Sequence, residues 1–286
     1  MATKYHARSI SLPSKSHPST VKVEEELRKM KTWESCSFSS SSVCGALLGL
    51  QDLYDSIDEL LKMGSTHQIL SCPQLKQLVD ELLEGSMKLL DVCSLAKDMA
   101  FQTQQHVGAL YSAVRRRKGD SAIKTTIAAY TCYRKKMKKE AKKLMISMKK
   151  MNEKFNSTQM TNLDNHLSSV IGAMRQAYSI NSSILESVLL YLTPLTKPKA
   201  PGWSLVSKWV HNGAIACESK SGLNEFESVD LALSSAVEEK EVEKLHMAQR
   251  RLESLEMAAR EIESGLDGVF RRSIKTRASL LNILSQ

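Results

Sequence analysis

The lysines between Lys124 and Lys154 are the residues of this sequence that point most clearly to chemistry. That stretch holds eleven Lys and Arg against two Glu, a net charge of +9. The whole 286-residue chain is also +9, so the other residues balance at 29 basic and 29 acidic. Clustered ammonium groups attract anions. We therefore expect an anionic partner to meet a surface formed by Lys135, Lys138, Lys139, Lys142, Lys143, Lys149 and Lys150.

The apolar residues of the same stretch predict a helix with two distinct sides. They recur three or four positions apart, which places them on one side of a helix of 3.6 residues per turn. The basic residues fill the other side. The residues expected to face the core are Tyr130, Tyr133, Met137, Ala141, Leu144, Met148, Met151 and Phe155.

The basic side of this helix has more than one interpretation. It suits an acidic membrane surface or an acidic protein partner, and the runs 115–118 and 134–139 also match a nuclear import signal. Nucleic acid is disfavoured, because no zinc module, homeodomain or aromatic stacking platform accompanies the charge. The alternative needs no partner. The basic side is then either simply solvated or lies beside an acidic helix, since residues 218–267 carry a net charge of −7.

The residues that most often perform catalysis or bind metals are scattered. Six Cys and seven His form no C-x-x-C or H-E-x-x-H motif, and no phosphate-binding Gly loop or G-x-S-x-G occurs. We expect no catalytic residue, no metal site, no cofactor and no small-molecule substrate. Cys93 and Cys132 are expected to fill space between helices, and His106 and His166 to be hydrogen-bonded structural residues.

The composition and spacing of the apolar residues predict an all-α fold, an elongated bundle of four to five long amphipathic helices. Aromatic residues make up only 5% of the chain, and six Pro are too few for a turn-rich β fold. The helices are expected at 24–33, 43–63, 74–118, 124–154, 160–192 and from 224–228 onward. The last of these carries a coiled-coil-like heptad pattern from Leu245 to Val269.

The chain is expected to form a single domain over residues 24–286, with a Pro-rich internal linker at 193–203. Residues 1–23 lack acids before Glu24 and are expected to form a disordered basic tail, or alternatively an organelle transit peptide. No apolar run approaches the ~20 residues of a membrane span. The expected location is intracellular, in the cytoplasm, with the chloroplast or the nucleus as alternatives.

Several segments together resemble a plant-specific family of uncharacterised proteins related to the BYPASS proteins. They are RSISLPSKSHP, KTWE, LLDVC at 89–93, SAVRRRKGD and the ending GVFRRSIKTRASLLNILSQ, which is the most specific. The resemblance implies a role in plant root and shoot development, through restraint of a mobile root-derived signal. It supplies no catalytic or ligand-binding residues.

Together these observations favour a non-enzymatic regulatory or adaptor protein that acts through helix surfaces and binds a protein partner. The alternative is a peripheral membrane protein that binds acidic lipid through the basic helix at 124–154. Screening by salt should separate the two, because attachment to lipid headgroups weakens as ionic strength rises.

Overall fold

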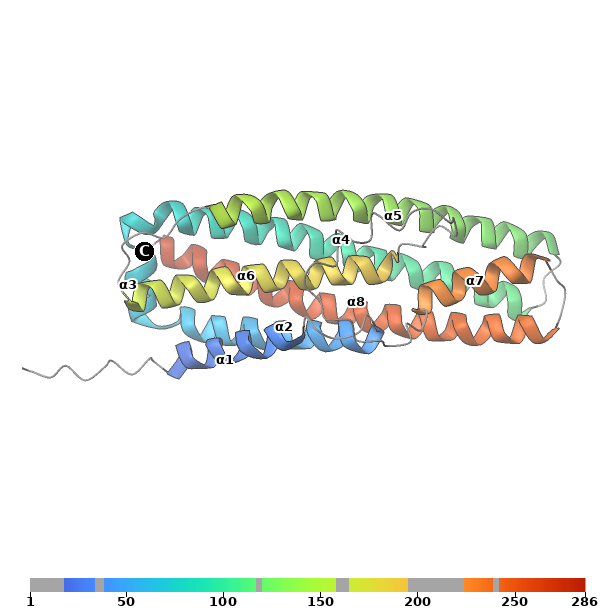
Figure 1. Cartoon of the computed structure of the whole chain (residues 1–286), viewed down its shortest axis with the longest axis horizontal. Helices are drawn as coiled ribbons and strands as arrows, with labels where there is room; N and C mark the ends of the chain where they lie inside the picture. The colour runs from blue at the N-terminus through green and yellow to red at the C-terminus, as the bar shows by residue number, and fades with distance from the viewer. Residues whose placement is uncertain are drawn as a thin grey trace, which may run out of the picture.

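A computed structural model describes residues 18–33, 39–116, 120–157, 165–194, 224–238 and 242–285. These residues form an elongated all-α bundle without strands, which confirms the predicted fold class (Figure 1). A 3₁₀ turn at Pro73–Leu75 precedes α4. The helices are α1 (Pro18–Trp33), α2 (Ser40–Leu61), α3 (Gly64–Leu70), α4 (Lys76–Arg115), α5 (Asp120–Ser157), α6 (Asn165–Leu192), α7 (Glu225–Glu238) and α8 (Val242–Leu284).

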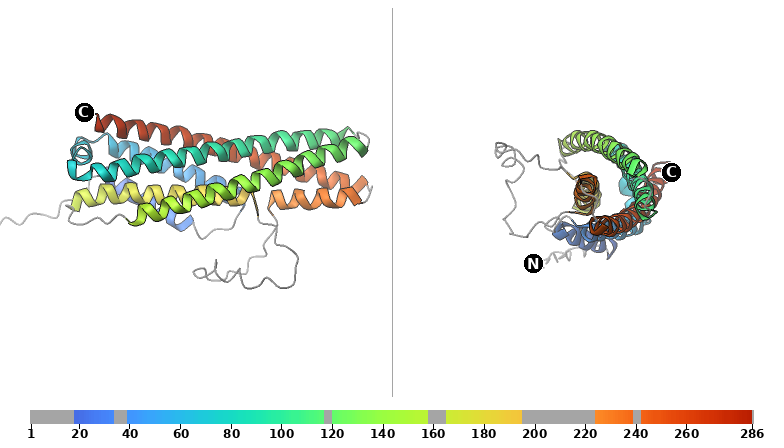
Figure 2. Two further views of the ribbon diagram at one scale, coloured as in Figure 1. Left: turned by 90° about the horizontal axis from the view of Figure 1, so that it is seen from above. Right: turned by 90° about the vertical axis from the view of Figure 1, so that its right-hand side faces the viewer.

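The long helices form an arc with one line of helix lying in its hollow (Figure 2). Seen along the bundle axis, the arc runs from α5 through α4 and α8 to α2 and α1. Helices α6 and α7 follow one another end to end inside this arc (Figures 1 and 2). Helix α6 therefore contacts α4, α5, α2 and α1, and it is buried on most of its circumference.

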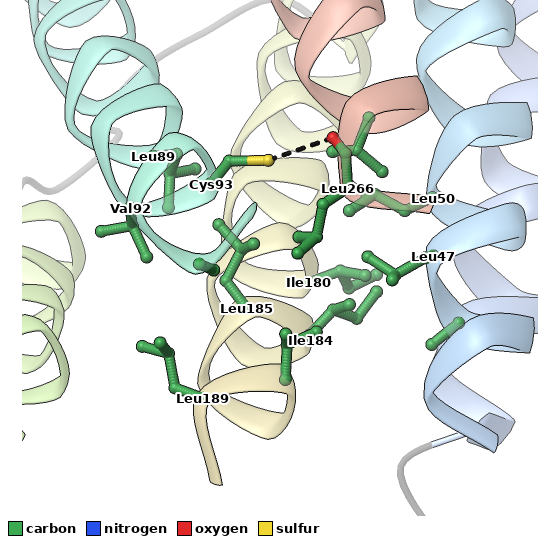
Figure 3. Packing of buried hydrophobic residues seen from close by; sticks show 14 of the residues in the cluster. Leu47, Leu50, Leu89, Val92, Cys93, Ile180, Ile184, Leu185, Leu189 and Leu266 are labelled. Carbon is green, nitrogen blue, oxygen red and sulfur yellow. Dashed lines mark hydrogen bonds between the residues drawn. The ribbon is translucent and has the colours of Figure 1, made fainter. Parts of the chain in front are cut away.

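Leucines and isoleucines from four helices meet in the hollow of the arc and form the core (Figure 3). Leu47 and Leu50 of α2, Leu185 of α6 and Leu266 of α8 are all fully buried there. Each such side chain contributes ~1.5–3 kcal/mol by leaving water. The apolar spacing of the sequence is thus converted into one continuous core that runs along the bundle.

Several predicted helix ends differ from those observed. Helix α2 begins at Ser40 and not at residue 43, because Ser39 is its N-cap: the Ser39 side chain accepts a hydrogen bond from the Ser42 amide at 3.2 Å. The helix predicted at 24–33 begins earlier, at Pro18, and the side chain of Val23 is buried. Proline fits the first turn of a helix, where its missing N–H has no acceptor. Residues 18–23 therefore do not belong to the predicted disordered tail, and residues 1–17 lie outside the described part of the chain.

The predicted last helix is two helices. Residues 224–238 form α7, and α8 starts again at Val242 and runs back along α7 in the opposite direction (Figure 1). Asn224 starts α7 as a capping box: its side chain accepts from the Glu227 amide at 2.9 Å, and Glu227 accepts from the Asn224 amide at 3.2 Å. Helix α7 fills the hollow beyond the end of α6, where it buries Phe226 and Val229. Residues 195–203 of the predicted linker lie outside the described residues.

Candidate functional site

Helix α5 lies at one end of the arc, where it packs on α4 and α6 (Figure 2). The apolar side predicted from the sequence is the side that it buries. Among the described side chains, Tyr130, Tyr133, Met137, Ala141, Met148 and Met151 are buried, and Leu144 is partly buried. This packing leaves the opposite side of α5 directed away from the bundle.

The seven predicted lysines lie together on that outward side, which we call the lysine face: Lys135, Lys138, Lys139, Lys142, Lys143, Lys149 and Lys150. All are exposed except Lys138, which is half-buried. Burial and the neighbouring Arg134 lower the pKa of the Lys138 ammonium. From Lys135 to Lys150 the lysine face extends ~22 Å along the helix axis at 1.5 Å per residue.

The lysine face has little acidic neutralisation within the described residues. The ion pair found there joins the Lys143 Nζ and the Glu140 carboxylate at 3.1 Å, three residues apart on the same exposed surface. A pair of this kind contributes only ~0–1 kcal/mol. The ammonium groups of this surface therefore remain available to an external anion.

Helix α8, the longer helix of the acidic segment 218–267, does not lie along the lysine face. The carboxylates of α8 pair instead with α4 and with α8 itself: Asp267 contacts Lys97 at 3.2 Å and Arg271 at 2.7 Å. Glu256 pairs with Arg260 at 2.8 Å. Helix α8 packs on α4, α2 and α7 and lies away from α5. Among the described residues, α8 is therefore not the internal partner of the lysine face. Helix α7 does reach α5, because the Asp230 and Glu227 carboxylates act on the Lys138 ammonium. For the other lysines of the face, the internal interpretation stays a prediction.

One basic residue of α5 belongs to the core and not to this face. The Arg134 side chain is buried, its Nη1 donates to the Leu192 carbonyl at 2.6 Å, and its Nη2 lies 3.4 Å from the Asp230 carboxylate. Its guanidinium also sits 4.4 Å above the ring of Phe226. Arg134 thus joins α5 to the end of α6 and the start of α7, and it is unavailable as part of an import signal at 134–139.

The cysteine and histidine predictions have mixed outcomes. Cys93 is buried as predicted, its thiol donates to the Leu266 carbonyl at 3.4 Å, and burial raises its pKa to about 12 (Figure 3). Cys132 is exposed on α5, so its predicted role as a core filler is wrong. His106 stacks on Tyr133 at 4.4 Å and has its pKa lowered by burial. The side chain of His166 lies outside the described residues.

The described part of the chain contains no group of three or more His, Cys, Asp or Glu side chains placed to hold a metal ion. None of its helices is both long enough and apolar enough to cross a membrane.

The sequence analysis missed a polar seam between α2 and α8. The Arg272 guanidinium donates to Asp55 at 2.9 Å and to Gln51 at 2.8 Å, and the buried carboxylate of Asp58 receives Lys275 at 2.6 Å and Thr276 at 3.2 Å. The available signal was the matched spacing of polar residues at 51, 55 and 58 and at 272 and 276. These residues join α2 to α8.

The string FRRSIKTR, which carries the most specific part of the resemblance, supplies much of this seam. Its Arg277 also donates to the Leu83 carbonyl and, at 2.8 Å, to the Ser86 hydroxyl of α4. Its Phe270 ring lies 5.2 Å from the Lys97 ammonium. The string thus fixes α8 between α2 and α4.

Comparison with known proteins supports the resemblance. Searches of curated proteins and of solved structures find no match. The family model described as Protein BPS1 matches residues 46–283, which include everything from the first turns of α2 to the end of α8. On this evidence the chain belongs to the BPS1 family of plant proteins related to BYPASS.

Proposed function

We propose that this BPS1-family chain is a non-enzymatic regulatory adaptor that acts by binding, with the lysine face of α5 as its recognition surface for an anionic partner. By its family, the process is root and shoot development in plants. The observation that carries the proposal is the arrangement of the lysines on the outward surface of α5. They stand side by side, and the ion pair described among them is that of Lys143 with Glu140.

Much of this arrangement of charges is unfavourable for the fold. Lys135 and Lys139, and likewise Lys139 and Lys143, stand four residues apart, where like charges destabilise a helix by ~0.2–0.5 kcal/mol per pair. The buried side of α5 already supplies its packing. Binding gives a reason for a surface whose like charges lower stability.

The charge distribution of the molecule also favours recruitment of an anion to α5. Because residues outside 124–154 balance at 29 basic and 29 acidic, the net charge is concentrated on one edge of the arc. Such asymmetry orients a protein as it approaches an anionic surface and speeds the encounter, with a strong dependence on ionic strength.

The proposal is tested with two variants of equal charge in plants that lack the endogenous protein. In the face variant, Gln replaces four residues of the lysine face: Lys138, Lys139, Lys142 and Lys143. In the control variant, Gln replaces four exposed basic residues on other helices or their ends: Lys62, Lys76, Lys88 and Arg250. Both variants lower the net charge by four.

At equal protein abundance, the wild type and the control variant should restore normal root and shoot growth, and the face variant should not. Full rescue by the face variant would show that the lysine face is dispensable and would overturn the proposal. Equal failure of both variants would also overturn it, because the requirement would then be for total charge and not for this surface.

A further inference from the structure

We propose that the anionic partner of the lysine face is the headgroup surface of an acidic membrane, on which α5 lies flat. This inference rests on the proposed function and names the partner of the same surface. It predicts a peripheral attachment in which the rest of the arc stays on the aqueous side of α5.

The shape of the lysine face suits a plane better than a peptide. Helix α5 is long and lies at one end of the arc, so its outward side forms a ridge with α4 and α6 behind it (Figure 2). A flat surface can touch such a ridge along all ~22 Å of the lysine face at once. An acidic peptide helix usually binds in a groove with apolar anchors, and here the apolar side of α5 is occupied by the core.

The lysine face carries one exposed apolar residue at its centre. Ile146 is 49% exposed and stands four residues from Lys142 and Lys150 and three from Lys143 and Lys149. Burying one isoleucine among headgroup carbons contributes ~1.5–3 kcal/mol at most. This is enough to assist attachment but too little to embed the helix, so charge should dominate the binding.

The magnitude of the electrostatic attraction is sufficient for attachment. A Lys near an anionic leaflet contributes ~1 kcal/mol, and this falls off within a Debye length. Helix α5 adds the exposed Lys124, which stands eleven residues before Lys135 on the same side of the helix. Several lysines acting together therefore give a micromolar-range affinity that disappears at high salt.

Nucleic acid fits the same surface less well. Proteins that bind single strands stack bases on exposed aromatic rings, but Tyr130 and Tyr133 of α5 are buried against the bundle. The Tyr133 hydroxyl is committed to the Met99 carbonyl at 2.6 Å. The lysine face thus offers charge without a stacking platform, which matches lipid headgroups.

The experiment is sedimentation with vesicles of phosphatidylcholine alone or with about 30% phosphatidylserine, at about 50 and about 500 mM NaCl. The full chain should sediment only with acidic vesicles at low salt. The face variant should bind at least about tenfold more weakly, since it loses four lysines of the surface. The control variant should bind acidic vesicles with an affinity within about twofold of the wild type, if binding depends on the position of the charges and not on their total.

A second readout reports orientation. Cys132 is exposed on the same side of α5 as Lys135 and Lys139. The partly buried Cys44 of α2 serves as the internal control. Acidic vesicles should slow alkylation of Cys132, measured peptide by peptide with mass spectrometry, and leave the rate at Cys44 unchanged. Equal protection of both thiols would contradict attachment through α5.

The possible results separate this inference from the proposed function. Absence of sedimentation with acidic vesicles, or an equal loss of binding in both variants, would overturn the membrane inference. If the face variant then still failed in plants, the lysine face would be functional and its partner would be an acidic protein. If the face variant succeeded in plants and the wild type bound no vesicles, both proposals would fall.

Discussion

Neighbouring residues of α5 with the same charge have opposite surroundings. Arg134 is buried against Phe226 and holds the carbonyl of Leu192, whereas Lys135, the next residue, is exposed. A guanidinium suits the buried position because it offers several donors in one plane and stacks on an aromatic ring. The basic run thus contains one structural residue, Arg134, beside the lysines of the outward surface.

The sequence separates these two classes only in part. The spacing of Tyr130, Met137 and Ala141 correctly predicted which side of α5 is buried, and therefore where the lysines point. The role of Arg134 depends on Leu192 and Asp230, which are 58 and 96 residues away in sequence. Such distant partners become visible only when the helices are placed together.

The buried Cys93 thiol leads to a prediction about alkaline stability. Its pKa is raised from 9.0 to about 12 by burial, so between these values the unfolded chain loses a proton that the folded chain keeps. The free energy of unfolding should therefore be unaffected below pH 9 and fall as pH rises further. The contribution of this thiol is about 1 kcal/mol per pH unit above 9.

Urea denaturation at two alkaline pH values measures this loss. Cys93→Ala should show a shallower decline than the wild type, although it is less stable at neutral pH because a buried group is lost. Cys132→Ala, which removes an exposed thiol, should decline as the wild type does. If all three proteins decline in parallel, the Cys93 thiol ionises as readily in the folded state as in the unfolded one.

At the scale of helices, the elements themselves were predictable and their junctions were not. The long helices follow from runs of apolar residues at spacings of three and four. The pattern from residue 74 to 118 was compatible with one long helix or two in register, and the structure has one, α4. The break after Glu238 was missed, because the local sequence there remains compatible with a helix. It is explained by packing: α7 must turn back on α8 to fill the hollow beyond α6 (Figure 1).

The close contact between α2 and α8 depends on glycines whose role was not predictable from the sequence. Gly265 and Gly268 lie inside α8, where glycine lowers the stability of a helix. In the structure a Cβ at Gly265 would come within 2.9 Å of the buried Leu47 side chain. The missing side chain therefore allows α2 to approach α8 closely, and the Gln51 amide reaches the Gly265 carbonyl at 3.3 Å.

Two alanine substitutions test this account of the α2–α8 contact. Gly265→Ala should destabilise the protein by ~1–3 kcal/mol, because the added methyl group overpacks the contact with Leu47. Gly108→Ala in α4 is the matched control, since no atom lies within 4 Å of its added Cβ, and it should be neutral or stabilising by up to ~1 kcal/mol. Thermal unfolding followed by circular dichroism measures both, and equal effects would mean that close approach is not the role of Gly265.

For the whole molecule, stability and the proposed binding depend on different residues. The core runs along the hollow of the arc, and the polar seam between α2 and α8 holds one side of it together. The lysine face contributes to neither. Net charge was the feature of the sequence that located this surface, because 124–154 carries +9 while the rest of the chain sums to zero.

This separation predicts how the face variant folds. Replacing Lys138, Lys139, Lys142 and Lys143 by Gln removes like-charge pairs on α5 at the cost of the exposed pair with Glu140. Gln and Lys have similar helix propensities, so helicity should stay the same and stability should rise by roughly 0.5–1 kcal/mol at low salt. Salt screens the repulsion, and the gain should vanish near about 1 M NaCl. Melting curves of both proteins at low salt and at about 1 M NaCl measure this difference in stability. A face variant less stable than the wild type at low salt would show that the lysines stabilise the fold.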